Sequence, residues 1–195
     1  MTYIGILVSF IFVNNIILNQ LLVGKGFLDV IQNIKTTLSY GILLVFIASL
    51  SCFFTWAVYN GILLPFRLAY LQTIVFIVII TTLTLAIEIV FGRISPELYR
   101  RIKDIFPLIA VNCAVLGICL IAVRSGYTAA ESLIAGAAAG TGYFLAVILL
   151  AAIQESMKKE WIPQPLRGIP ITLISAGLMA LAFMAFDEAL LKNLM

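Results

Sequence analysis

Apolar segments of helix length dominate this sequence and limit the folds that it can adopt. A helix needs about 20 mostly apolar residues to cross the hydrocarbon core of a bilayer. Six segments of roughly that length are expected to span: Ile4–Val23, Leu38–Asn60, Tyr70–Phe91, Ile105–Val123, Glu131–Ile153 and Pro170–Phe186. The connections between them hold nearly all of the charged residues, as loops outside hydrocarbon require. The sequence therefore predicts an all-α integral membrane protein.

The composition supports this fold class and a single membrane domain. Hydrophobic residues make up 63% of the 195 residues and charged residues 11%, which leaves too little polar surface for a soluble domain of this length. The stretch from Met1 to Leu22 lacks the basic start and the small-residue cleavage site of a signal peptide, so we expect it to remain as a spanning helix. We therefore treat residues 1–195 as one membrane domain.

Basic residues are distributed unevenly between the two sides of the expected membrane. The loops after the first, third and fifth spans carry nine: Lys25, Lys35, Arg93, Arg100, Arg101, Lys103, Lys158, Lys159 and Arg167. The other side carries three: Arg67, Arg124 and Lys192. The positive-inside rule places the loops richer in Lys and Arg in the cytoplasm, so both termini should face outward. The net charge of +3 thus reports orientation and does not indicate nucleic acid binding.

Two short stretches with side-chain amides are similar to each other. Val13–Leu18 contains Asn14 and Asn15, and Val111–Leu116 contains Asn112. An unpaired amide is costly in lipid, so these groups should face a protein interior or a cavity. A division after the third span gives two halves, approximately 1–92 and 93–195, whose three spans each run in opposite orientation. We therefore predict two inverted repeats in which the first and fourth helices, which carry the amides, are interrupted.

The two interruptions have unequal support in the local sequence. A polar and glycine-rich run that a lipid-facing helix would rarely carry extends from the second half of the first span into the loop after it: Asn19, Gln20, Gly24, Lys25 and Gly26. In the fourth span, Pro107 lies in the first turn, where proline is allowed. That interruption therefore depends on Asn112 and Gly117.

Four longer stretches carry a resemblance to one known family. They read FVNNIILNQLL, PELYRRIKDIFPLIAVNCAVLG, GYFLAVILLAAIQE and IPQPLRGIPITLISAGLMALAFMAF. They are similar to the RnfA/NqrE-type subunit of the ion-translocating Rnf and sodium-pumping NADH:quinone oxidoreductase complexes, over essentially the whole chain. The resemblance implies a prokaryotic inner-membrane location, six helices in two inverted halves, and a sister membrane subunit of the RnfE/NqrD type with opposite topology.

The resemblance also implies a [2Fe–2S] cluster shared by the two subunits, with two cysteine ligands from each. Cys113 matches the family ligand in the fourth helix, and Asn14, Asn15 and Asn112 would surround the centre. Where the family has its other cysteine, in a GxCPF-like stretch, this chain has Lys25. A lysine ammonium has no lone pair to bind iron, so three alternatives stay open. The cluster is absent, another residue or the partner completes it, or this paralogue has lost the function.

Other small residues in the spans have a packing interpretation. The three cysteines are an odd set within apolar segments, which argues against a disulfide framework. Cys52 and Cys119 match no family ligand, so we expect them to pack in the core. Gly136 and Gly140 have the spacing that lets two membrane helices approach closely, and we expect them to bring the fifth span near another helix.

Glu88 is an ionisable residue inside the third span, and such residues are functional candidates. It lies close to the cytoplasmic end of the span, so two interpretations stay open. Glu88 is part of a cation pathway, or it reaches the membrane interface or pairs with Arg93.

The sequence shows no motif of a soluble enzyme. It has no histidine, no Walker-type loop and no G-x-G-x-x-G after a strand, so we expect no independent catalytic site. The favoured function is a membrane subunit that relays electrons and couples their transfer to Na⁺ or H⁺ movement, with flavin and iron–sulfur subunits as neighbours in the complex. The alternative is a secondary transporter-like or structural subunit without a redox centre. The ion, the electron donor and acceptor, and the choice between Rnf and Nqr complexes stay open.

Overall fold

The described part of the structure, a computed structural model, is helical throughout its regular elements. It covers residues 7, 10–11, 34–157 and 163–194. The labelled elements are α4 (Ile34–Val58), the π-helical turn η2 (Tyr59–Leu63), η3 (Ala69–Leu71), α5 (Gln72–Ile94), α6 (Pro96–Ile102), η4 (Lys103–Ile105), α7 (Phe106–Ala110), α8 (Cys113–Arg124), α9 (Ala129–Met157), η5 (Gln164–Leu166) and α10 (Ile169–Leu194). This architecture confirms the predicted all-α fold class.

Several of these helices have the length and apolar character of membrane spans. Among the described residues, three continuous stretches qualify: Thr37–Leu63, Ala69–Ile94 and Ala129–Met157. A fourth is a bent pair, Lys103–Ala110 and Cys113–Arg124, in which the second helix is bent by 46° from the direction of the first. These four correspond to the predicted second, third, fifth and fourth spans.

The remaining two predicted spans have a different status. The apolar part of α10, Ile169–Phe183, coincides with the predicted sixth span but is shorter than the others. Nearly all of the predicted first span, with Asn14 and Asn15, lies outside the described residues, and so does Lys25 in the loop after it. The inverted repeat with halves 1–92 and 93–195 therefore stays a prediction.

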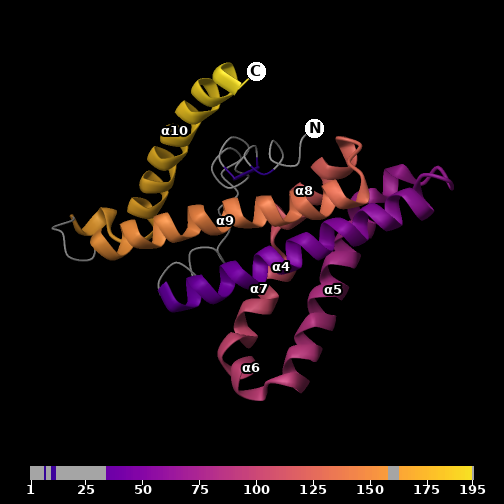
Figure 1. The fold of residues 1–195 in the computed structure, drawn as a ribbon. Coiled ribbons are helices and arrows are strands. Elements are labelled where there is room, and N and C mark those ends of the chain that lie inside the picture. The colour runs from indigo at the N-terminus through magenta and orange to yellow at the C-terminus, as the bar shows by residue number, and fades with distance from the viewer. Residues whose placement is uncertain (1–6, 8–9, 12–33, 158–162, 195) are drawn as a thin grey trace.

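Helices α4 and α9 lie side by side in opposite directions and form the centre of the fold (Figure 1). A Cβ added at Gly140 would lie 2.7 Å from the Cα atom of Val45, and one added at Gly136 would lie 2.7 Å from the backbone oxygen of Ala48. The two backbones approach this closely because neither glycine carries a side chain. The predicted role of Gly136 and Gly140 in helix packing is thus confirmed, with α4 as the partner helix.

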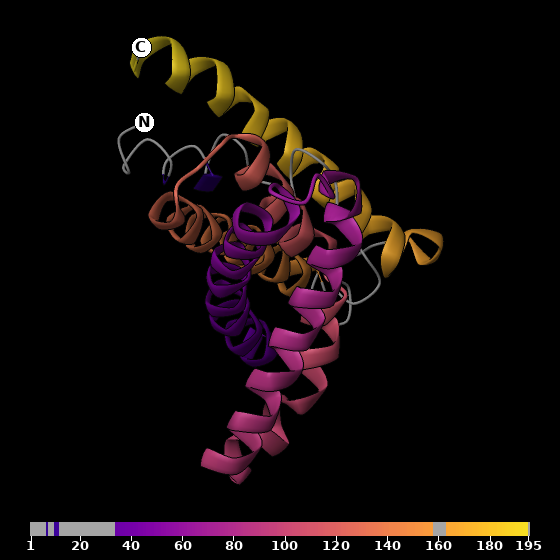
Figure 2. The same cartoon turned by 90° about the vertical axis from the view of Figure 1, so that its right-hand side faces the viewer.

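The other helices lie on two sides of the α4–α9 pair. Helix α5 and the α6–α7 segment extend together away from the pair, and α10 lies on its opposite side (Figures 1 and 2). Phe76 and Ile80 of α5 pack into the core with Phe106 and Ile109, all of them buried. The outer face of α5 exposes large apolar side chains, as a surface in contact with lipid or with another membrane protein requires: Ile74, Val78, Leu85, Ile89 and Ile94.

The start of α9 is fixed by a reciprocal pair of hydrogen bonds. The backbone N–H of Thr128 donates to Oε2 of Glu131 over 2.9 Å, and the N–H of Glu131 donates to Oγ1 of Thr128 over 3.4 Å. This is a capping box, which satisfies N–H groups that a helix start leaves without partners. It ends the short connection from α8 and directs the chain into the long α9 helix.

Candidate functional site: the break at Asn112

The fourth span is interrupted at Asn112, as predicted. Helix α7 ends at Ala110, and Asn112 has an extended backbone with φ of −75° and ψ of 112°. Its Oδ1 atom accepts a hydrogen bond of 2.8 Å from the N–H of Ala114, so Asn112 is the N-cap of α8. Asparagine is among the residues most favoured at this position. Gly117 lies inside α8 and takes no part in the break, so that half of the prediction is wrong.

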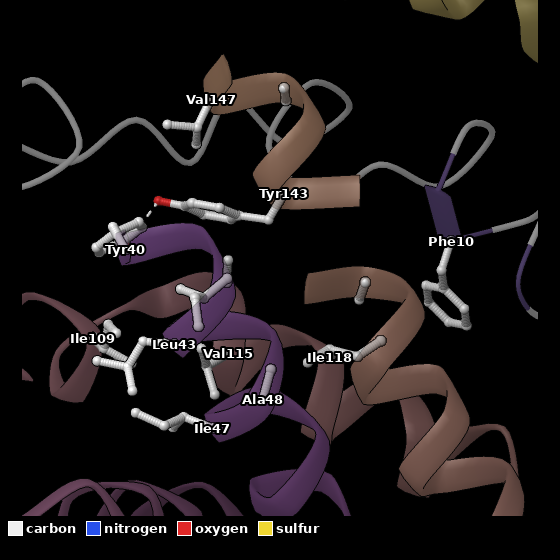
Figure 3. Packing of buried hydrophobic residues seen from close by; sticks show 14 of the residues in the cluster. Phe10, Tyr40, Leu43, Ile47, Ala48, Ile109, Val115, Ile118, Tyr143 and Val147 are labelled. Atoms are coloured by element: carbon white, nitrogen blue, oxygen red, sulfur yellow. Dashed lines mark hydrogen bonds between the residues drawn. The ribbon is translucent and has the colours of Figure 1, made fainter. Parts of the chain in front are cut away.

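The amide nitrogen of Asn112 connects the break to the α4–α9 pair. Nδ2 of Asn112 donates a hydrogen bond of 2.8 Å to the hydroxyl of Tyr40 in α4. The hydroxyl of Tyr40 also lies 3.3 Å from that of Tyr143 in α9, as Figure 3 shows. Asn112 therefore finds a partner inside the protein, as an amide in an apolar span should. We call these three residues the Asn112–Tyr40–Tyr143 cluster.

The surroundings of this cluster are apolar. Tyr40 and Tyr143 are only 2% and 4% exposed, and Leu43, Ile109 and Val115 lie in the same core (Figure 3). Neither tyrosine stands out in the sequence as a site residue, because an aromatic residue in an apolar helix resembles ordinary core. The usable signal was the hydroxyl, since a phenol within a span needs a hydrogen-bond partner.

Cys113 is the first residue of α8 and follows the cap directly. Its side chain is exposed on this chain, in contrast to the core residues that follow it in α8. Within the described ranges no group of three or more Cys, His, Asp or Glu side chains is arranged to hold a metal ion. In this part of the chain, Cys113 is therefore the one potential metal ligand of these residue types at the break.

The other two cysteines lie together elsewhere in the core. Sγ of Cys52 in α4 lies 3.5 Å from Sγ of Cys119 in α8, and both residues are buried. They are core residues, as predicted, but their mutual contact was not foreseen. A separation of 67 residues in the sequence gave no reason to pair them.

Glu88 has a different partner from the one that the sequence suggested. Its Oε1 atom accepts a hydrogen bond of 3.0 Å from the hydroxyl of Tyr99 in α6. No ion pair between Glu88 and Arg93 forms among the described residues, and the positions of Glu88 in a cation pathway or at the membrane interface stay predictions. The hydrogen bond to Glu88 raises the pKa of Tyr99 above its ordinary value, because the neutral phenol is the donor. The contact ties the end of α5 to α6.

Comparison with known proteins decides the family. The family model described as "Rnf-Nqr subunit, membrane protein" matches residues 3–190. The chain belongs to this Rnf-Nqr subunit family. Since the match covers almost the whole chain, the resemblance inferred from the sequence is confirmed, and this family member is a multi-pass membrane protein.

Curated relatives of this Rnf-Nqr family member are similar over nearly their full lengths. One, from Acetobacterium woodii, is named as belonging to the Na⁺-translocating ferredoxin:NAD⁺ oxidoreductase complex; it is 41% identical, over 96% of this chain and 97% of that protein. Two others are named as belonging to an ion-translocating oxidoreductase complex. The one from Edwardsiella ictaluri is 39% identical, over 95% of this chain and 96% of its own length. The one from Syntrophotalea carbinolica is 38% identical, over 93% and 94%.

This family member has one described residue, Cys113, that fits the role of a ligand to an iron–sulfur cluster. The exposed thiol of Cys113 has the access that a metal-binding cysteine needs. Cys52 and Cys119 are buried against each other, so they are not ligands in this arrangement. Further ligands would have to come from a partner or from residues outside the described ranges, and the chemistry of Lys25 does not suit that role.

Proposed function

We propose that this Rnf-Nqr family member is a membrane subunit of an ion-translocating electron-transport complex in a prokaryotic inner membrane. Its relatives are named as subunits of such complexes, and they match it over almost their whole length. The observation that carries the proposal is the exposed Cys113 thiol at the break of a spanning helix. A chain that only packed against lipid would not need a capped, interrupted helix with an exposed thiol at the interruption.

In this proposal Cys113 is the ligand that the chain supplies to a [2Fe–2S] cluster shared with a sister subunit of opposite topology. When bound, such a cluster supplies one-electron transfer. The residues of this chain position that ligand. Asn112 caps α8 and so fixes the backbone from which Cys113 projects. The Tyr40 hydroxyl accepts a hydrogen bond from the amide nitrogen of Asn112 and so keeps that side chain in place. Asn14 and Asn15 are proposed to belong to the same surroundings.

Ion movement is proposed to involve Glu88, with Na⁺ or H⁺ as the transported ion. Its carboxylate is half-buried near one end of α5, and the Tyr99 hydroxyl holds one oxygen in place. The uneven distribution of Lys and Arg supports a cytoplasmic position for this end of α5. Subunits that carry flavin and further iron–sulfur centres would supply and remove the electrons.

Iron analysis of the purified complex tests the proposal. The parent complex should contain iron and acid-labile sulfide and should give a paramagnetic signal when reduced. Cys113→Ser should lower the iron content and remove the part of the signal that belongs to this centre, since it removes the sulfur from the break. Cys119→Ser is the matched control in the same helix, and it should leave both nearly unchanged because its side chain points into the core.

Two outcomes would contradict the proposal in different ways. A signal that is insensitive to Cys113→Ser would show that Cys113 is not a ligand. If neither the parent complex nor a Lys25→Cys variant contained iron, the electron-transfer role would fail, and the transporter-like or structural role would replace it.

A further inference from the structure

Two thiols meet inside the protein at a place where the proposed function does not use them. Sγ of Cys52 and Sγ of Cys119 are 3.5 Å apart, and the two residues are 1% and 0% exposed. One thiol belongs to α4 and the other to α8, so the contact joins two helices. Cys113, at the start of α8, is exposed and takes no part in it.

A third helix closes over this pair. A Cβ added at Gly136 of α9 would lie 3.0 Å from Sγ of Cys52 and 2.8 Å from Cα of Ser49. The glycine therefore lets the α9 backbone pass directly over the Cys52 thiol. A hollow of about 10 Å³ lies between the same three helices; Ala48 and Ile118 line it, and neither cysteine does.

We propose that Cys52 and Cys119 form a redox-modification site, at which a peroxide closes the two thiols to a disulfide between α4 and α8. A disulfide needs a sulfur–sulfur distance of about 2.05 Å, so the two atoms must approach by roughly 1.5 Å. The shielding of both sulfurs selects the oxidant, because only a small, uncharged molecule such as hydrogen peroxide enters so tight a space. Because both sulfurs are shielded, the reaction should be slower than that of an exposed cysteine.

The reaction balances with one peroxide for each disulfide. The sulfur of one thiol attacks an oxygen of hydrogen peroxide, the O–O bond breaks, and the thiol proton leaves with the other oxygen as water. The product is a sulfenic acid. The second sulfur attacks the sulfenic sulfur, the S–S bond forms, and the hydroxyl leaves with the second thiol proton as another water. The two sulfurs lose two electrons, and the peroxide gains them.

The disulfide would connect the two helices that hold the break. Tyr40 and Cys52 both belong to α4, while Cys113 and Cys119 both belong to α8. A covalent link six residues after Cys113 would restrict any movement of α8 relative to α4. We expect peroxide to inhibit the complex and a reducing dithiol to restore its activity. This consequence rests on the proposed function, whereas formation of the disulfide does not.

Thiol counting in native membranes tests whether the disulfide forms. A Cys113→Ser chain retains two cysteines, and a maleimide polymer added after denaturation counts them by gel shift. Hydrogen peroxide should remove both adducts together, and dithiothreitol should restore both. With Cys52→Ser added, the remaining Cys119 thiol should keep its adduct at the same peroxide dose. Loss of adducts one at a time, or equal loss from the variant without Cys52, would overturn the proposal.

Peptide mapping of the oxidised parent complex covers the case in which Cys113→Ser does not assemble. The expected product is one cross-linked species that joins the peptides of Cys52 and Cys119, with a mass two hydrogens below their sum. Its absence from an active, peroxide-treated complex would overturn the disulfide and leave the proposed function intact. Its presence in a complex that contains no iron would support the disulfide and contradict the proposed function.

Discussion

Replacement of Asn112 should show how much of the broken helix depends on a single amide. Asn112→Ala removes the N-cap of α8 and the hydrogen bond to Tyr40. Loss of a cap costs about 1 kcal/mol, and loss of an interhelical hydrogen bond in a membrane protein costs about 0.6 kcal/mol. The free energy of unfolding should therefore fall by about 1.6 kcal/mol, which is more than a tenfold change in the unfolding equilibrium constant.

A second pair of substitutions separates the two contributions. Tyr40→Phe leaves the cap in place and removes the hydroxyl contacts with Asn112 and Tyr143, so it should cost about 0.6 kcal/mol for each contact. The double variant should cost less than the sum of the two single changes, because both remove the same hydrogen bond. Asn60→Ala is the matched control, since the Asn60 amide is exposed and donates only to a backbone oxygen one turn earlier, that of Trp56.

Unfolding in mixed micelles with increasing dodecyl sulfate measures these costs. Loss of helical circular dichroism gives the transition, and the reaction of buried Cys52 and Cys119 with a maleimide reports loss of the core. If Asn112→Ala cost no more than Asn60→Ala, the cap would not stabilise α8. If Tyr40→Phe cost as much as Asn112→Ala, the hydrogen bond to Tyr40 would account for the whole effect and the argument from capping would be refuted.

Three further predictions concern other parts of the chain. Gly136→Ala should destabilise the chain by about 1–3 kcal/mol in the same titration, because the new Cβ meets backbone atoms of α4. Gly117→Ala is the control and should be neutral or stabilising, because the space around Gly117 is open. Equal effects of the two substitutions would contradict the close approach of α4 and α9. Glu88→Gln should lower the pKa of Tyr99 toward its ordinary value, because the charged acceptor is lost, and tyrosinate absorbance in the two proteins measures this; superimposable titrations would refute it. A topology reporter fused after Tyr127 should report the outer side, and a cytoplasmic signal would reverse the proposed orientation.

The sequence was sufficient to predict the long helices. The predicted spans Leu38–Asn60, Tyr70–Phe91 and Glu131–Ile153 match α4, α5 and α9 within a few residues. Hydrophobicity over a whole span is a strong signal because every residue in hydrocarbon contributes to it. Helix ends carry less information, and the structure extends α9 to Met157 through residues that are not apolar.

The interruption was predictable and most of its contacts were not. Asn112 signalled a break because an amide is both costly in lipid and favoured at a helix start. The prediction that Gly117 contributes to the break was wrong because glycine fits within a membrane helix as well as at its end. Tyr40 and Tyr143 join Asn112 only through the fold, at separations of 72 residues for Tyr40 from Asn112 and 103 for Tyr40 from Tyr143. A single sequence does not indicate which of its distant residues are in contact.

The pairing of α4 with α9 has a consequence for biogenesis. Contacts between them join residues that are 84 to 103 positions apart. At a synthesis rate of about 5–20 residues per second, roughly 4–20 s pass between the appearance of α4 and that of its partner. During this interval α4 enters the membrane with its tightest packing face uncovered. Lipid must cover that face first and be displaced later, so the break in the fourth helix acquires its final supports only after α9 has been inserted.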